Sequence, residues 1–89
     1  MKPVKIQVKP IDIRRGKRNS GNLCPIARAI KRQIKCRSVF VGDEEIDLVL
    51  LNDDFTKFIH MPLKAVDFVR RFDEGLTVKP ISFVLKSNS

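Results

Sequence analysis

Apolar residues recur at helical spacing in two stretches of the chain. In residues 22–35, the apolar side chains fall on one arc of a helix, with about 100° between successive residues: Leu23, Ile26, Ala27, Ile30 and Ile34. Pro25 suits the first turn of this helix, where its missing N–H has no helical partner. Asn22 or the Cys24 backbone can serve as the cap, and Asn22 has the better side chain for it. In residues 62–75, a second helical pattern ends at Gly75, which suits the left-handed conformation that follows a helix. The pattern predicts two amphipathic helices.

Other stretches are typical of β-strands, because apolar and polar residues alternate or because β-branched and aromatic residues dominate. They comprise residues 4–8, 38–41, 45–51, 55–60 and 77–85. Turn-forming residues 42–44 and 52–54 connect the three middle strands into a meander. The predicted order is β-α-β-β-β-α-β in a single α+β domain, residues 1–89. We expect a mainly antiparallel sheet with two helices packed on one face, and terminal strands that pair with each other or flank the meander.

These two periods also predict which side chains form the hydrophobic core. Every second residue of a strand should face inward, and so should the apolar arc of each helix. The predicted core residues are Val4, Ile6, Val8, Ile26, Ile30, Ile34, Val39, Val41, Ile46, Leu48, Leu50, Phe58, Val66, Val69, Phe72, Phe83 and Leu85. A chain of 89 residues has room for one modest core of this kind.

Residues 11–21 interrupt the regular pattern and form a basic loop that contains two glycines. Asp12 suits the cap of a single helical turn that ends at Gly16. Four cations lie within five residues: Arg14, Arg15, Lys17 and Arg18. Like charges at this density repel each other unless an anion neutralises them. Two interpretations remain open, a flexible solvated connector and a loop that contacts phosphates. At the other end of the chain, residues 86–89 are expected to form a frayed tail.

Charge is unevenly distributed along the chain, whose formal net charge is +8. Residues 1–37 contain twelve lysines and arginines but only one acidic residue, whereas residues 38–89 contain six basic and nine acidic residues. Such asymmetry favours a polyanionic partner, although a solvated surface that keeps a small protein soluble accounts for it equally well. The acidic residues within 43–47 form either a solvated hairpin tip or a contact point for a basic partner.

The cations of the basic loop and of the first helix form the candidate binding site. We expect the following residues to contact a polyanion: Arg14, Arg15, Lys17, Arg18, Arg28, Lys31, Arg32 and Lys35. The preferred partner is nucleic-acid backbone, because such a strip would span successive phosphates without reading sequence, and an acidic protein surface is the runner-up. The chain has no Trp or Tyr, and its six Phe mostly fall at core positions. Base stacking is therefore not expected, which favours a duplex.

Residues typical of catalysis or metal binding are sparse. Cys24 and Cys36 would lie about 18 Å apart along a helix, which is beyond disulfide reach and favours reduced thiols. Cys24 is the best candidate for a reactive thiol, because a helix N-terminus and Arg28 would lower its pKa, but a small buried packing residue is the more common role. His60 is the only histidine. We therefore expect no catalytic residues, no metal site and no cofactor.

The sequence contains no apolar run long enough to cross a bilayer. Residues 1–8 alternate in polarity and so lack the continuous apolar block of a signal peptide. Together with the reduced cysteines, these features predict a cytoplasmic protein without a membrane partner.

Several short motifs resemble a family of small bacteriophage and prophage proteins. The most specific are Cys-Pro-Ile-Ala at residues 24–27 and Phe-Asp-x-Gly at residues 72–75, followed by a Val-x-Pro pair at residues 78–80. The resemblance covers residues 11–85. It implies a phage-type origin, and hence the cytoplasm of the host cell, but no reaction, since no activity is assigned to this family.

Two hypotheses about function agree with these patterns. The first is a small non-enzymatic binding module whose basic loop and helix contact nucleic-acid backbone. The alternative is a phage-encoded inhibitor or adaptor that binds a host protein or a defence complex, in the manner of an anti-CRISPR protein. Salt dependence separates the two hypotheses, because affinity based on phosphate contacts falls steeply as salt is added.

Overall fold

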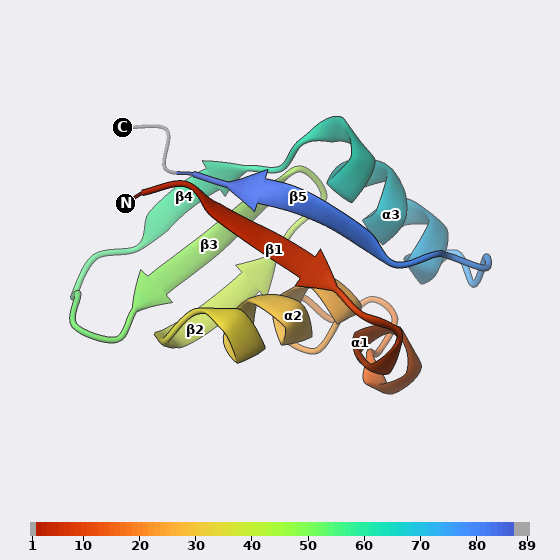
Figure 1. Cartoon of the computed structure of the whole chain (residues 1–89), viewed down its shortest axis with the longest axis horizontal. Helices are drawn as coiled ribbons and strands as arrows, with labels where there is room; N and C mark the ends of the chain where they lie inside the picture. Colours follow the sequence, from red (N-terminus) through yellow and green to blue (C-terminus); the bar gives the residue numbers. More distant parts are fainter. Residues whose placement is uncertain (1, 87–89) are drawn as a thin grey trace.

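The computed structural model describes residues 2–86, in which five strands and three helices form a small α+β domain (Figure 1). In chain order the elements are β1 (Val4–Val8), α1 (Pro10–Arg15), α2 (Pro25–Gln33), β2 (Cys36–Val41), β3 (Glu45–Leu50), β4 (Lys57–His60), α3 (Leu63–Asp73) and β5 (Ile81–Leu85). The predicted fold class is confirmed, and the short helix α1 is added to the predicted order. Most of the tail predicted to fray, residues 87–89, lies outside the described residues.

The strands form two antiparallel sheets, where the sequence indicated one. β1 pairs with β5 along their whole length, with Ile6 opposite Phe83. β2, β3 and β4 form the expected meander, in the order β2-β3-β4. The two-stranded sheet crosses the three-stranded sheet in Figure 1. The terminal strands therefore pair with each other, which is one of the two arrangements that the sequence predicts.

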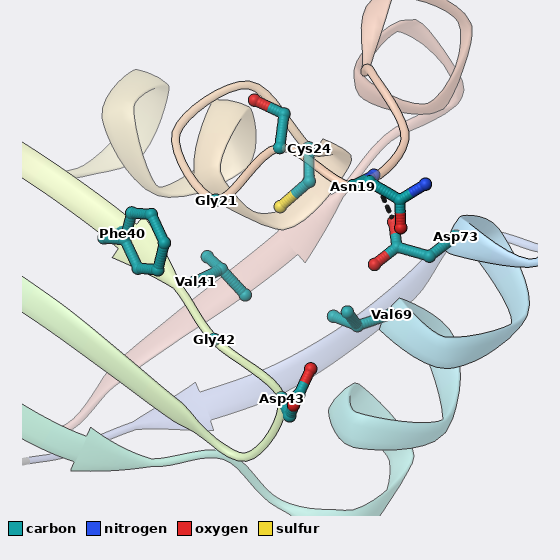
Figure 2. A pocket seen from close by; sticks show the side chains of 10 residues that line it. Asn19, Gly21, Cys24, Phe40, Val41, Gly42, Asp43, Val69 and Asp73 are labelled. Carbon is teal, nitrogen blue, oxygen red and sulfur yellow. Dashed lines mark hydrogen bonds between the residues drawn. The ribbon is translucent and has the colours of Figure 1, made fainter.

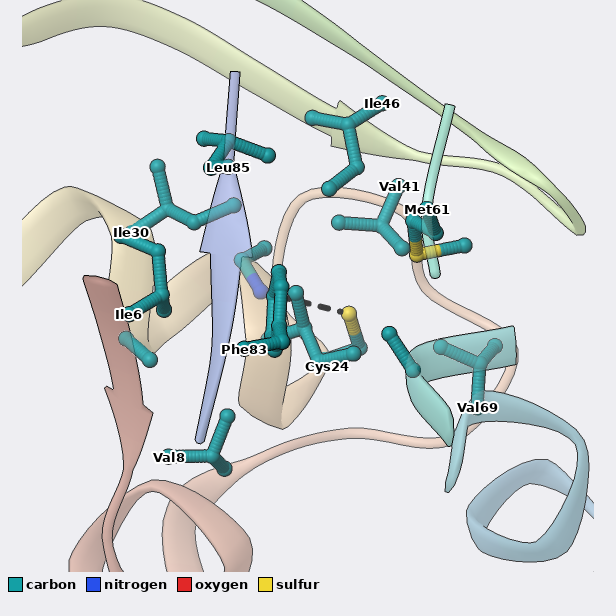
Figure 3. Close-up of a cluster of buried hydrophobic side chains, with 14 of the residues drawn as sticks. Ile6, Val8, Cys24, Ile30, Val41, Ile46, Met61, Val69, Phe83 and Leu85 are labelled. Atoms are coloured by element: carbon teal, nitrogen blue, oxygen red, sulfur yellow. Dashed lines mark hydrogen bonds between the residues drawn. The ribbon is translucent and has the colours of Figure 1, made fainter. Parts of the chain in front are cut away.

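One hydrophobic cluster fills the space between the sheets (Figure 3). Ile6 and Leu85 come from one sheet, Ile46 and Leu48 come from the other, and Ile30 comes from α2; all five are fully buried. α2 contacts both β1 and β2, and α3 contacts β5. α2 therefore bridges the two sheets, and its apolar arc packs into the core as the helical spacing predicts.

The first predicted helix is shorter than its apolar pattern indicates. α2 ends at Gln33, and the next residue, Ile34, already has an extended backbone with φ −128° and ψ 131°. β2 begins two residues later, so pairing with β3 replaces the helical hydrogen bonds. Lys35 consequently lies beyond the helix, and Leu23 precedes it. The cap is Cys24 and not Asn22, since the Cys24 Sγ accepts a hydrogen bond from the Ala27 N–H at 3.5 Å.

One predicted core residue is wrong. Phe58 is 57% exposed, whereas its neighbour Ile59 is buried. Ile59 lies opposite Ile46 in the β3–β4 ladder, and residues that pair across two strands point to the same face of the sheet. Because Ile46 faces the core, Ile59 does so too. Of the other predicted core residues, Val4, Ile34, Leu50 and Phe72 are partly buried against the cluster and the rest are buried.

The end of α3 follows the sequence prediction closely. Gly75 has a φ of +83°, the left-handed conformation in which glycine has no Cβ penalty. Its N–H donates to the carbonyl of Phe72, and the N–H of Leu76 donates to the carbonyl of Arg71. These bonds satisfy carbonyls that have no partner within the helix.

Candidate polyanion-binding surface

The short helix α1 brings two arginines to the surface beside α2. Asp12 is in its first turn, and its Oδ2 accepts a hydrogen bond from the backbone N–H that precedes the helix, at 2.9 Å. Gly16 follows the helix and lies so close to Pro25 that an added Cβ would be 2.6 Å from the proline ring. This close approach holds the end of α1 on the start of α2, and the last turn of α1 presents Arg14 and Arg15, both of which are exposed.

The segment after α1 is a closed loop with its own hydrogen bonds. The Lys17 N–H donates to the carbonyl of Leu23 at 2.9 Å, which joins the two ends of the loop. Asn19 adopts a left-handed φ of +54°, and its N–H donates to Oδ1 of Asp73, at the end of α3, at 2.9 Å. Lys17 and Arg18 are exposed on this loop. The basic segment is thus a short helix followed by a loop that is anchored by backbone hydrogen bonds.

The position of Arg18 is set by the C-terminus of α3. A Cβ added to Gly75 would lie 3.2 Å from the Arg18 Nη1, so the guanidinium group lies against this glycine. Cations are favoured at this position, because the last carbonyls of a helix carry partial negative charge. We refer to the four cations Arg14, Arg15, Lys17 and Arg18 as the basic end. α1, the loop and the end of α3 lie together at the end of the molecule opposite the start of β1 and the end of β5 (Figure 1).

Arg32 is exposed on α2 but is not a free cation, because it already has an acidic partner. Its Nη2 lies 2.6 Å from Oδ2 of Asp12 and 3.0 Å from the carbonyl oxygen of Gln7. The Asp12 side chain is only 4% exposed, so its carboxylate is shielded from water, whereas the Arg32 side chain remains 36% exposed. Arg32 therefore ties α2 to α1 and to β1. Helical periodicity places Arg32 on the polar arc but carries no information about a partner twenty residues away.

The remaining cations of the predicted strip differ in their surroundings. Arg28 is half-buried, and its Nε is buried without a hydrogen-bond partner. The Lys31 Nζ donates to the carbonyl of Asn22 at 2.6 Å, although Lys31 itself is exposed. Lys35 is exposed but lies beyond the end of α2. Of the eight predicted residues, the four of the basic end are therefore gathered on one short helix and its adjoining loop.

The ion pair between Arg32 and Asp12 leads to a prediction about stability. Replacing Arg32 with Gln should lower the free energy of unfolding by about 1–3 kcal/mol, because the buried carboxylate loses its charged partner. Lys35→Gln removes an equal charge from an exposed site and should change the free energy by about 0.5 kcal/mol or less. Denaturant titrations followed by circular dichroism measure both. Equal effects of the two substitutions would contradict the structural role of Arg32.

A cavity of about 360 Å³ lies behind the loop of the basic end (Figure 2). It is bounded by the loop, the end of β2, the β2–β3 turn and α3, and Cys24, Asp43 and Asp73 are among its lining residues.

Cys24 is 4% exposed. Burial raises the pKa of its thiol, and the hydrogen bond from the Ala27 N–H offsets this only in part. The predicted role of Cys24 as a small buried residue under the helix start is confirmed. The helix N-terminus by itself would lower the pKa of the thiol, but the desolvation that accompanies burial outweighs this effect.

Thiol labelling tests this environment of Cys24. Iodoacetamide reacts with thiolates, so Cys24 should be alkylated slowly in the native protein at neutral pH. Cys36 is half-buried and should be alkylated first, which provides an internal reference. Mass spectrometry of peptides after timed labelling distinguishes the two sites. Faster labelling of Cys24 than of Cys36 would contradict a buried, protonated thiol.

One surface feature was missed by the sequence reasoning, which assigned the phenylalanines mostly to the core. Phe40 is 56% exposed, and together with the exposed Phe58 it lies on the outer face of the β2-β3-β4 sheet. A signal for Phe40 was present in the sequence: Val39 and Val41 both face inward, so the residue between them must face outward. In β4 the two apolar residues Phe58 and Ile59 are adjacent, so alternation alone did not show which of them faces outward.

Within residues 2–86, no group of three or more His, Cys, Asp or Glu side chains is placed to hold a metal ion. The helices of this part of the chain are also too short and too polar to cross a membrane.

No family model, curated protein or solved structure matches the chain.

Proposed function

We propose that the protein is a non-enzymatic binding module whose basic end contacts the backbone of a nucleic acid. The observation that carries this proposal is that four neighbouring cations are exposed and lack acidic partners within residues 2–86. Among the described residues, no carboxylate lies within 4.0 Å of the charged groups of Arg14, Arg15, Lys17 or Arg18. A cluster of unneutralised cations favours a ligand that carries several negative charges.

The arrangement of the basic end supports repeated phosphate contacts. α1 and the anchored loop hold the backbone that carries the four cations in place before binding, so little backbone conformational entropy is lost when an anion binds. Lys31 and Lys35 are exposed along and beyond α2 and extend the positive surface from the basic end. Arg28 and Arg32 contribute to the local potential, but Arg32 keeps its ion pair with Asp12 and is not assigned a phosphate.

A duplex is the preferred form of nucleic acid. Single-stranded binding without sequence preference uses aromatic side chains on which bases stack, interleaved with cations. The exposed Phe40 and Phe58 lie instead opposite the carboxylate of Asp47 in the sheet, where phosphates would be repelled. Contacts to the backbone alone suit a duplex, whose phosphates are regularly spaced and need no base readout.

The alternative proposal is that the basic end docks on an acidic surface of a host or defence protein, as an inhibitor or adaptor. The same unneutralised cations support it. The phage-type origin and the location in the host-cell cytoplasm rest on the sequence motifs at residues 24–27 and 72–75 and remain part of this proposal.

Equilibrium binding to defined duplexes tests the proposed function. Two labelled duplexes of about 20 base pairs with unrelated sequences should bind with affinities within a few-fold of each other at about 50 mM salt, since phosphates carry no sequence information. Polyglutamate serves as a probe of the alternative, because it offers negative charge without the phosphate spacing. Tighter binding to polyglutamate than to both duplexes would favour the acidic protein surface and contradict nucleic-acid binding.

A further inference from the structure

The outer face of the β2-β3-β4 sheet carries a second surface with a different chemical character. The residues that alternate with the core residues of these strands face away from the cluster. On the three strands they are Ser38, Phe40, Glu45, Asp47, Val49, Phe58 and His60. Two of these are large aromatic residues and two are carboxylates. The exposed cation of β2, Arg37, lies at the bulge before Ser38 and is paired with Asp54 and the Leu51 carbonyl. This face is therefore both apolar and acidic, in contrast to the basic end.

Two phenylalanines and one aspartate form a row across the three strands. Phe40 lies opposite Asp47 in the β2–β3 ladder, and Asp47 lies opposite Phe58 in the β3–β4 ladder. Because neighbouring strands are about 4.8 Å apart, the row places one ring on each side of the carboxylate. These three residues, with Ser38 and Thr56, border a shallow groove of about 530 Å³. Among the described residues, no hydrogen-bond donor or cation is paired with the Asp47 carboxylate.

The ring of Phe40 is supported by the loop that precedes α2. A Cβ added to Gly21 would overlap the ring of Phe40, so the ring packs directly on the glycine backbone. The Gly21 carbonyl also accepts a hydrogen bond from the Val41 N–H at 2.8 Å, which fixes this loop to β2. An exposed aromatic side chain held in this way loses little freedom on binding. Phe40 is thus an ordered part of the surface.

The negative charges around the groove favour a cationic ligand. Asp43 and Glu44 in the β2–β3 turn and Glu45 at the start of β3 add to the negative charge of Asp47. A phosphate backbone would be repelled here, which excludes the use of these rings as a base-stacking platform. A cation is attracted both by the carboxylate and by the faces of aromatic rings. The chemistry of the groove therefore fits a basic polypeptide.

We propose that this face, the aromatic–acidic groove, binds an arginine or lysine of an extended basic segment from a partner protein. The cationic group lies over Asp47, between Phe40 and Phe58, and forms a charge-assisted hydrogen bond with the carboxylate. Neighbouring cations of the segment interact with Glu45 and with the acidic turn. The groove is separate from the basic end, so this proposal does not depend on nucleic-acid binding.

A labelled peptide of alternating arginine and serine is a suitable probe, because period-two spacing puts every arginine on one side of an extended chain. We expect saturable binding, with chemical-shift changes concentrated on the rings of Phe40 and Phe58. Asp47→Asn should weaken binding about tenfold and Phe58→Ser about threefold to tenfold. Asp67→Asn and Leu63→Ser change the same kinds of group at exposed positions of α3 and should leave peptide binding within twofold of the wild type. All four variants should retain duplex binding.

Three results would overturn the proposal. The first is no saturable binding of the arginine peptide up to about 1 mM at low salt, which corresponds to the weakest specific affinities. The second is an equal loss of peptide binding in Asp67→Asn and Asp47→Asn, since net charge and not the groove would then explain the affinity. The third is concentration-dependent self-association in sedimentation that Asp47→Asn abolishes, which would assign the groove to a second copy of the chain.

Discussion

Replacing Ile30 with Ala should lower the free energy of unfolding by about 2–5 kcal/mol, the usual range for removing a large aliphatic side chain from a packed core. Ile30 is fully buried in α2, the helix that bridges the two sheets, and belongs to the same cluster as Ile6 and Leu85. The substitution does not disfavour the helix itself, because Ala has the highest helix propensity. The decrease in the free energy of unfolding therefore measures the cost of the cavity and of the apolar surface that is no longer buried. Denaturant titration with an unchanged m-value measures it.

Leu63→Ala is the matched control for this substitution. Leu63 is also a helical aliphatic residue, but it is 87% exposed in the first turn of α3. Its truncation should change the free energy of unfolding by about 0.5 kcal/mol or less. A cost below about 1 kcal/mol at Ile30 would mean that α2 does not dock on the two sheets through its apolar arc.

Reversing two charges of the basic end should weaken duplex binding by about 100-fold at low salt, because two phosphate contacts become repulsions. Arg15→Glu with Lys17→Glu is the preferred variant, since both side chains are exposed and neither is paired with a carboxylate in the described part of the chain. Arg32 is left unchanged because of its ion pair with Asp12. Fluorescence anisotropy with a labelled duplex measures the change.

Lys5→Glu with Lys64→Glu provides the charge-matched control. Both lysines are exposed, and they lie on β1 and at the start of α3, outside the basic end. The control changes the net charge by the same amount and should weaken binding only a few-fold, through the long-range potential that salt screens. If both double variants lose affinity equally, the net charge of the protein and not the basic end determines binding.

The parts of the fold that depend on neighbouring residues were predictable from the sequence. The turn at residues 42–44 and the left-handed Gly75 are local features with specific conformational requirements, and both occur as predicted. Strand alternation likewise identified Ile6, Val8, Val39 and other inward residues. Where β4 has apolar residues on both faces, alternation is lost, and pairing with Ile46 decides that Ile59 and not Phe58 is buried.

The organisation of the candidate site depended on contacts that no local pattern contains. The sequence showed that cations cluster in residues 14–18, but not that the loop is anchored to Asp73, fifty-four residues from Asn19. The polar arc of the first helix grouped Arg32 with the free cations, whereas the buried carboxylate of Asp12 engages it. The division of the strands into two sheets is likewise set by the packing of the whole core.

Salt titration of duplex binding by the wild-type protein tests the central proposal most directly. If the four cations of the basic end each neutralise one phosphate, the logarithm of the association constant should fall with the logarithm of the salt concentration with a slope of about −3.6. Between about 50 and 200 mM salt the affinity should then fall by about 150-fold, and equally for duplexes of different sequence. No measurable duplex binding at about 50 mM salt, or a slope near zero, would contradict nucleic-acid backbone binding by the basic end.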